Sequence, residues 1–195
     1  MRIGLNGWFL DQPHAGSGQY VRHLRRELTR GAGIDCLTFW PGGGENMPGN
    51  VPVPLLPVQA DLAKVWYEQF SLPPVARRHQ VDLLHYPYFA APLSRLCPVV
   101  VTIHDLIPLL FPEYRRNPLL KLYNALISAG ARRARAVIAD SQHTRRDVER
   151  LLGIPADRIH VVYLAADESF HTNVDAQTVA AVKRHYRLDD YVFYM

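Results

Sequence analysis

Residues 99–105 read Val-Val-Val-Thr-Ile-His-Asp. The first five are β-branched without interruption, a composition that favours strands. Such a run is typical of a parallel strand buried on both faces, because a strand with one wet face alternates apolar with polar residues. The stretch therefore predicts a buried parallel strand over Pro98–Ile103, with two polar residues, His104 and Asp105, directly beyond its end.

Strand-like and helix-like patterns alternate along the rest of the chain. Further strands are expected at Arg2–Asn6, Ile34–Phe39, Val81–His85, Ala134–Ala139 and Ile159–Val162. Helices are expected at Ser17–Arg30, at Asp61–Leu72, from Asn117-Pro118 onward, from Ser141 to Leu152 and at Asp175–Tyr186. This alternation predicts an α/β fold: a Rossmann-like, doubly wound parallel sheet with helices on both faces and right-handed crossovers.

Individual residues indicate where several elements begin and end. Pro73-Pro74 should stop the second helix, whereas Pro118 suits the first turn of the third. Ser141 can cap the helix that follows it, and Gly153 can end that helix. The glycine- and proline-rich stretch Pro41–Gly49 is expected to be a loop.

The chain length of 195 residues suits one large domain, or one domain and the start of another. The alternating pattern weakens after Tyr163. We therefore expect a domain over residues 1–164 and a linker with a connecting helix over 165–190. Residues 191–195 resemble the first strand of a domain that is missing from the chain.

The composition is that of an ordinary globular protein, with 48% hydrophobic residues, 21% charged residues and a formal net charge of +4. Four arginines gather on the first predicted helix: Arg22, Arg25, Arg26 and Arg30. They are either a solvated helix face or a patch for phosphates or an anionic membrane surface. A nucleic-acid partner is not expected, because the arginines lack interleaved aromatic residues.

Cys36 and Cys97 are the two cysteines, and both lie in apolar, strand-like stretches. They are interpreted as buried thiols in a reducing compartment. The first ten residues lack the pattern of a signal peptide, and no apolar run approaches the roughly 18 residues of a membrane span. The expected location is cytoplasmic, with peripheral contact at the inner face of the membrane left open.

Ligands of open parallel sheets bind beyond the carboxyl ends of the strands. Polar residues that follow or end the predicted strands are therefore candidates for a site: Asn6, His85, Tyr86, His104, Asp105 and Ser141, with Gly16, Ser17, Gly18 and Tyr20 at the start of the first helix. His104 could donate a hydrogen bond, act as a base or stack on a ligand, or it could be a structural cap of its loop.

Gly16-Ser17-Gly18 could bring free backbone N–H groups to a phosphate or a sugar hydroxyl, or could be an ordinary loop into a helix. The dinucleotide-binding fingerprint does not fit, because Val21 stands where its third glycine is required. The histidines and cysteines have no metal-ligand spacing, so no metal site is expected.

Several short motifs, in order, are similar to the first half of family-four retaining glycosyltransferases. They are Met1–Gly4 with Gly16–Tyr20, then Asp82–His85, Val101–Pro108, Ala136–Ser141 and Ile154-Pro155 before Arg158–Val162. The resemblance covers nearly the whole chain. The stretch Thr102–Pro108 looks most like the branch that builds cell-surface polysaccharides, often with mannose.

The resemblance implies the GT-B fold, in which two Rossmann-like domains face a cleft, and makes residues 1–164 the acceptor-binding domain. It implies that His104 and, less strongly, Asp105 act at the catalytic centre, and that Gly16, Ser17 and Gly18 approach the donor phosphates. The acceptor would lie near Asn6, Tyr20, His85, Tyr86 and Ser141. The donor substrate would be a nucleotide sugar and the acceptor a glycan or a lipid-linked molecule, with no metal or other cofactor.

The chain also departs from the family pattern. The donor-contacting pair of glutamates of the second domain has no counterpart here, and the linker reads Leu164–Phe170 in place of an Asn-Gly-Val-Asp type stretch. Asp140 stands before Ser141, where the family usually has an apolar residue. We therefore expect little or no turnover from this chain alone. The alternative is a non-catalytic module that binds sugar or phosphate, or that pairs with a separate donor-binding chain.

Overall fold

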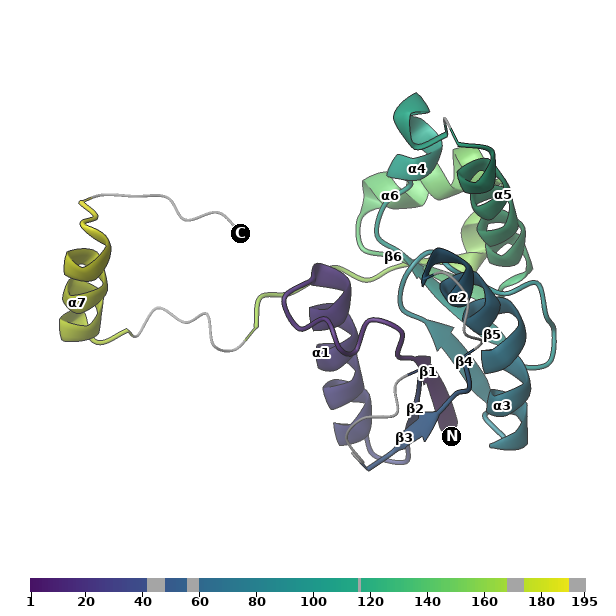
Figure 1. The fold of residues 1–195 in the computed structure, drawn as a ribbon, viewed down its shortest axis with the longest axis horizontal. Helices are drawn as coiled ribbons and strands as arrows, with labels where there is room; N and C mark the ends of the chain where they lie inside the picture. The colour runs from purple at the N-terminus through teal and green to yellow at the C-terminus, as the bar shows by residue number, and fades with distance from the viewer. Residues whose placement is uncertain (42–47, 56–59, 116, 168–173, 190–195) are drawn as a thin grey trace. The chain divides into compact units, whose positions relative to one another are not determined.

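A computed structural model describes residues 1–41, 48–55, 60–115, 117–167 and 174–189 of the chain (Figure 1). The chain divides into two compact units, Met1–Tyr163 and Leu164–Met195. In the second unit, helix α7 (Ala176–Tyr186) begins at Asp175, whose carboxylate accepts the backbone N–H of Thr178 at 2.9 Å. The strand predicted at 191–195 lies outside the described residues.

The described part of the first unit contains a seven-stranded sheet in which every pairing is parallel. Its strands are β1 (Arg2–Asn6), β2 (Asp35–Trp40), β3 (Asn50–Pro52), β4 (Leu83–Tyr86), β5 (Val99–Ile103), β6 (Ala136–Ala139) and β7 (Ile159–Val161). Their order in the sheet is β3-β2-β1-β4-β5-β6-β7. The winding direction reverses between β1 and β4, which is where sheets of this kind form a ligand-binding crevice.

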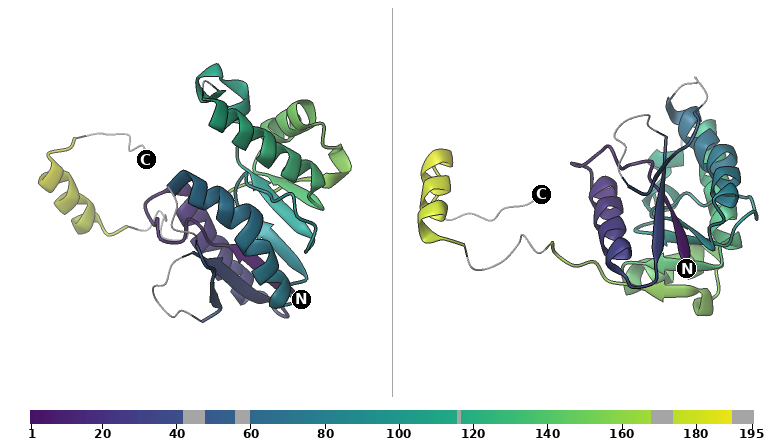
Figure 2. Two further views of the ribbon diagram at one scale, coloured as in Figure 1. Left: turned by 45° about the vertical axis from the view of Figure 1, so that its right-hand side comes forward. Right: turned by 90° about the horizontal axis from the view of Figure 1, so that it is seen from below.

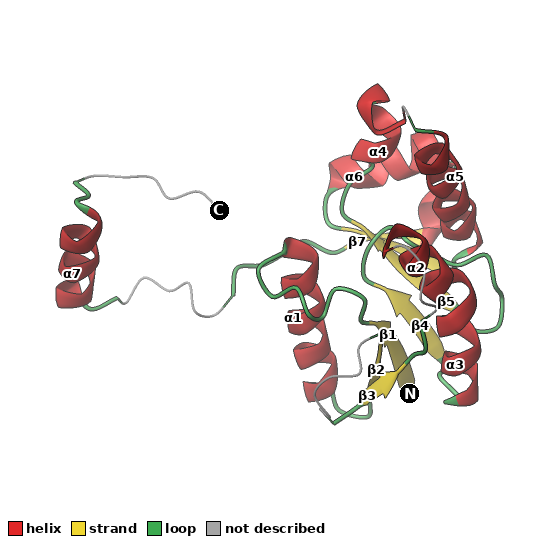
Figure 3. Cartoon of the chain, viewed as in Figure 1, coloured by secondary structure: helices red, strands yellow, loops and turns green. Residues whose placement is uncertain are grey.

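Helices cover both faces of the sheet (Figures 2 and 3). The α-helices are α1 (Gly16–Arg30), α2 (Ala60–Trp66), α3 (Leu72–Arg78), α4 (Ile107–Leu110), α5 (Pro118–Arg133) and α6 (Gln142–Asp147). Helix α1 lies on one face, and α2, α3 and α5 lie on the other. This arrangement confirms the predicted Rossmann-like α/β fold.

The six strands expected from the sequence are all present, with ends shifted by two residues or fewer. The buried run at 99–103 behaves as its composition predicts: Val101 and Ile103 are fully buried, and only Val100 is partly exposed. Strand β3, an edge strand of three residues that ends in Pro52, was not expected from the sequence. Most of the predicted loop at 41–49 lies outside the described residues.

The expectation that Pro73-Pro74 would stop the second helix is wrong. Helix α2 passes through a π-helical turn, Tyr67–Ser71, directly into α3, which carries prolines in its first turn. The N–H of Leu72 bonds to the carbonyl of Tyr67, five residues earlier. The wider turn starts a new helical segment just before Pro73. Pro73 has no N–H group to donate, and in the first turn of a helix none is required.

The predicted helix ends are confirmed by their hydrogen bonds. Asn117 Oδ1 accepts the N–H of Leu119 at 2.8 Å, at the start of α5. Ser141 Oγ accepts the N–H of Thr144 at 3.0 Å, at the start of α6. After α6, a π-helical turn ends at Gly153, which has a φ of 63°. Positive φ values favour glycine, so this residue suits the end of the helix.

Buried side chains form a layer on each face of the sheet. The larger layer includes Phe39, Tyr67 and Leu84, and the smaller one, under α1, includes Leu5 and Val21. Cys97 is buried as expected, but Cys36 is only half-buried, which corrects the prediction for that residue. Burial raises the pKa of both thiols.

Two glycines in the first turn of α1 differ in what surrounds them, and this difference predicts opposite effects of alanine. A Cβ on Gly18 would lie 1.9 Å from the carbonyl oxygen of Gln12, whereas a Cβ on Gly16 would meet nothing within 4 Å. We expect Gly18→Ala to lower the free energy of unfolding by about 1–3 kcal/mol. Gly16→Ala should be neutral or slightly stabilising, because alanine favours helix.

Urea denaturation of the two variants beside the unaltered chain measures this difference. Equal midpoints for the two variants would show that the loop before α1 adjusts freely, and that Gly18 is not held against Gln12.

Candidate functional site

The polar residues at the carboxyl ends of the central strands form a connected group on the α1 side of the sheet. Thr102 and His104 are two residues apart at the end of β5, so their side chains point to the same face. Tyr20, in the second turn of α1, covers both: its ring meets the ring of His104 edge-on at 4.7 Å, and its hydroxyl lies 3.4 Å from Thr102 Oγ1. Burial raises the pKa of Tyr20, so this hydroxyl is protonated.

His104 is held between two oxygen atoms from neighbouring strands. Its Nδ1 lies 3.1 Å from Asp140 Oδ2, just after β6, and its Nε2 lies 3.2 Å from the carbonyl oxygen of Pro87, just after β4. Both oxygens are acceptors, so both contacts are hydrogen bonds only when both ring nitrogens carry a proton. The side chain of His104 is 27% exposed, so the ring is oriented by protein groups and still reachable by a ligand.

Thr144 fixes the two loops that carry His104 and Asp140. Its hydroxyl lies 2.9 Å from the backbone carbonyl oxygen of His104 and 3.5 Å from Asp140 Oδ1. Ser141 helps to position Thr144, because its Oγ accepts the backbone N–H of Thr144. Helix α6 therefore holds the end of β5 against the end of β6.

His85 lies beneath this group as a buried, neutral side chain. Its Nε2 is 2.9 Å from Thr102 Oγ1, which joins it to Tyr20 through the threonine hydroxyl. Burial, with a smaller effect from His104, lowers the pKa of His85 to about 4. At neutral pH it is uncharged and serves the site through hydrogen bonding.

The first turn of α1 opens toward the same edge of the sheet. The residue before it, Ala15, provides no side-chain cap, and the first turn contains no acidic residue. The N–H groups of Gly16, Ser17 and Gly18 have no intrahelical partners at this end of the helix. Backbone N–H groups and the helix dipole together favour an anion here.

The remaining predicted residues lie in different surroundings. Asn6 is fully buried at the end of β1, where its Oδ1 accepts the N–H of Trp8 at 3.0 Å; its Nδ2 has no partner among the described residues. Tyr86 is fully buried and donates to the carbonyl of Glu68 at 2.9 Å. Asp105 is exposed, and its Oδ1 accepts the N–H of Ile107 at 2.9 Å, which starts α4.

The structure thus brings Tyr20, His85 and His104 together, and adds Thr102, Asp140 and Thr144 to them. Asp140 could have been found from its place directly after β6, where an acidic residue departs from the family pattern. Thr144 carried no signal in the sequence, since it looks like an ordinary helix residue, and Thr102 lay in the family-like stretch without being singled out as a site residue.

An ion pair between the partly buried Lys64 and the fully buried Glu68 lies near the crevice between β1 and β4. Lys64 Nζ is 2.5 Å from Glu68 Oε1 and 2.7 Å from the hydroxyl of Tyr123, and it faces the rings of Phe9 and Tyr88 at 5.8 and 4.9 Å. Burial raises the pKa of the fully buried Glu68, although Lys64 opposes the shift. Burial also acts to lower the pKa of Lys64, but the charge of Glu68 leaves that pKa raised.

Within the described residues, no cluster of three or more His, Cys, Asp or Glu side chains could hold a metal ion. No helix there is long and apolar enough to cross a membrane. The arginines of α1 bind parts of the chain itself: Arg22 and Arg25 donate to the carbonyls of Leu10 and Pro48. Arg26 and Arg30 pair with Glu27. These contacts favour a structural role for that face.

The solved structures that resemble this fold include glycosyltransferases and a UDP-GlcNAc 2-epimerase. Sucrose-phosphate synthase from Thermosynechococcus elongatus matches with a TM-score of 0.66 and 16% identity, over 97% of this chain and 53% of that one. HepE from Anabaena, solved with UDP and glucose, matches with a TM-score of 0.61 and 16% identity, over 95% and 50%. MnaA from S. aureus, solved with UDP, matches with a TM-score of 0.57 and 10% identity, over 95% and 51%.

The chain spans about half the length of these structures. A comparison with curated proteins finds no match. The fold is therefore the Rossmann-like α/β fold found in one half of GT-B glycosyltransferases. A profile described as Glycosyltransferase Family 4 matches residues 14–170, which is most of the chain. The chain belongs to Glycosyltransferase Family 4.

The buried neutral His85 predicts a loss of stability in acid. Its pKa is about 4 in the folded chain and 6.5 in the unfolded chain, so the unfolded state binds the proton first as the pH falls. We expect this residue to remove about 3 kcal/mol from the free energy of unfolding as the pH falls from 7 to 4. Urea denaturation across that range, beside His85→Gln, isolates the effect, because the glutamine variant should show a shallower decline. Parallel curves for the two proteins would contradict a neutral, buried His85.

Because Lys64 and Glu68 form an ion pair, we expect the removal of one partner alone to destabilise the fold. Glu68→Leu leaves a mostly buried ammonium without its carboxylate, and should lower the free energy of unfolding by about 3–5 kcal/mol. Lys64→Met combined with Glu68→Leu should cost less than Glu68→Leu by itself, since no unpaired charge remains. Chemical denaturation of the single and double variants measures the difference. A double variant that is less stable than the single one would mean that packing, not charge, dominates this cluster.

Proposed function

We propose that this chain is the acceptor-side domain of a retaining glycosyltransferase that transfers a hexose, such as mannose, from a nucleotide sugar to a glycan or lipid-linked acceptor. The observation that carries the proposal is the placement of His104 at the carboxyl edge of the sheet, oriented by Asp140 and Pro87 and adjacent to the uncapped start of α1. An oriented, partly exposed imidazole beside the uncapped N–H groups of a helix suits a sugar that carries phosphate.

The chemistry assigns different tasks to the two features. Transfer requires stabilisation of a leaving diphosphate while the sugar carbon becomes cation-like. The N–H groups of Gly16–Gly18 suit the phosphate oxygens, and the His104 ring suits a hydroxyl of the transferred sugar or acceptor. Neither step calls for a metal or another cofactor from this chain.

Membership of the family supports glycosyl transfer, and the match to half of each related structure supports a role for one domain. Nucleotide recognition in the proposal belongs to a second domain, so the chain of residues 1–195 should show little transfer alone. Tight binding of UDP or GDP to this chain would instead assign the donor nucleotide to the first domain.

Asp140 and Asp105 offer a matched pair for testing the site, because both follow a strand and lie near His104 in sequence or space. Asp140→Asn should weaken binding of mono- and oligosaccharides about 5- to 20-fold, since an amide holds the imidazole less firmly than a carboxylate does. Asp105→Asn should have a smaller effect, because the Asp105 side chain caps a turn at the surface.

Saturation-transfer NMR with mannose, glucose and galactose measures the binding, and His104→Gln serves as the variant that removes the ring. The proposal fails if none of the sugars bind, or if His104→Gln and Asp140→Asn bind them as the unaltered chain does. A larger effect of Asp105→Asn would transfer the role of the orienting carboxylate to Asp105.

A further inference from the structure

Large apolar side chains are exposed together where α4 leads into α5. Within residues 107–122, six of them are each between 39% and 68% exposed: Ile107, Phe111, Tyr114, Leu119, Leu120 and Leu122. We call these six residues the apolar tip. Soluble monomeric proteins rarely expose apolar side chains in such a group, so the group marks a binding surface.

The apolar tip belongs to one ordered part of the chain. Asn117 caps the start of α5, and its carbonyl accepts the N–H of Lys121 at 3.1 Å, so the first turn of the helix is complete. Asn124 Nδ2 donates to the carbonyl of Pro108 at 3.4 Å, which ties α5 to α4. In Figures 1 and 2, α4 and the first turn of α5 lie together at one end of the first unit, beyond the sheet. This end can contact a large surface without any change in the core.

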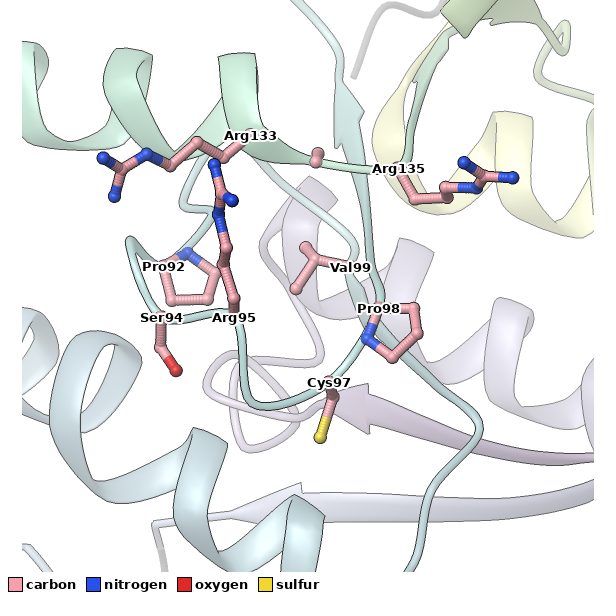
Figure 4. A pocket seen from close by; sticks show the side chains of 9 residues that line it. Pro92, Ser94, Arg95, Cys97, Pro98, Val99, Arg133 and Arg135 are labelled. Carbon is pink, nitrogen blue, oxygen red and sulfur yellow. The ribbon is translucent and has the colours of Figure 1, made fainter.

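The exposure is confined to the start of α5. Further along the helix, Ile127 and Ala131 are buried in the core. At the carboxyl end, Arg133 lines a small pocket together with Arg135, and the two guanidinium groups extend to opposite sides (Figure 4). The helix is therefore packed in its second half and polar at its end, and packing within the described part of the first unit does not account for the leucines of its first turn.

The charge around the apolar tip complements an anionic surface. Residues 107–122 contain three basic residues and one acidic residue, Glu113, so their formal charge is +2. Lys121 is exposed and stands between two of the exposed leucines. A lysine in this position can lay its methylene groups on hydrocarbon while its ammonium group reaches lipid phosphates. Tyr114 also suits the boundary between a membrane and water, where tyrosine is enriched.

We propose that the apolar tip docks on an anionic lipid bilayer, with its six side chains among the upper acyl chains and Lys121 at the headgroups. The apolar area that is buried and the attraction to anionic lipid together set the strength of such docking. The tip begins at Ile107, three residues beyond His104, so the two backbones are at most about 11 Å apart. A bilayer at the tip would therefore lie beside the candidate site. The proposal does not depend on the sugar-transfer activity.

The test is sedimentation of the chain with phosphatidylcholine vesicles, with and without phosphatidylglycerol. The variant Leu119→Gln/Leu122→Gln removes apolar surface from two side chains that are 65% and 68% exposed. Glutamine favours helix nearly as well as leucine, so the fold should be preserved, and thermal unfolding verifies this. The matched control is Leu62→Gln/Phe70→Gln, because these side chains are 51% and 60% exposed on α2 and the turn that follows it.

We expect binding to the vesicles with phosphatidylglycerol that weakens at least about tenfold in the tip variant and stays unchanged in the control. Lys121→Gln should weaken binding to these anionic vesicles and leave any binding to pure phosphatidylcholine unchanged. Equal weakening in the tip variant and the control, or no sedimentation with either kind of vesicle, would overturn the proposal. Analytical ultracentrifugation without lipid adds a further check. Self-association that is lost in the tip variant, in a chain that does not bind vesicles, would assign the tip to a second copy of the chain instead.

Discussion

All seven strands of the described sheet run in one direction, so their carboxyl ends meet at a single edge. This constraint determines where chemistry can occur, because each strand delivers the residue after its end to the same rim. His104 follows β5, Asp140 follows β6 and Pro87 follows β4, and the three come together although they are far apart in sequence. The short loops beyond the strands set their geometry.

The rim is connected to a polar layer beneath it. His85, Thr102 and Tyr20 form a chain of contacts between β4, β5 and α1, and burial keeps the histidine neutral. A buried polar group without a partner is costly, so such a chain is stable only in one arrangement. Tyr20 of this layer therefore packs on the His104 ring, Asp140 bonds to the ring, and Thr144 holds the backbone of His104.

The sequence predicted the sheet well because burial on two faces leaves a composition that can be read locally, as at 99–103. It predicted poorly which residues near the strand ends reach the site, because that depends on the direction of each side chain and on the partner that it binds. His85 and Tyr86 were both expected at the site, but adjacent residues of a strand point to opposite faces, so Tyr86 enters the core and bonds to Glu68. Asp105 looked equivalent to other rim residues, but its carboxylate accepts the N–H two residues on, a local contact common for aspartate.

The start of α1 differs from the starts of α5, α6 and α7 in a way that bears on function. Asn117, Ser141 and Asp175 cap α5, α6 and α7 with their side chains, whereas Ala15 leaves the first N–H groups of α1 without a side-chain partner. A cap typically contributes about 1 kcal/mol to stability, so leaving one out has a cost. Gly18 adds a second constraint, since its close approach to Gln12 excludes a side chain at this turn. The missing cap leaves backbone N–H groups without a protein partner at the start of the helix whose Tyr20 packs on His104, which is the arrangement expected where a ligand's phosphate oxygens complete the helix.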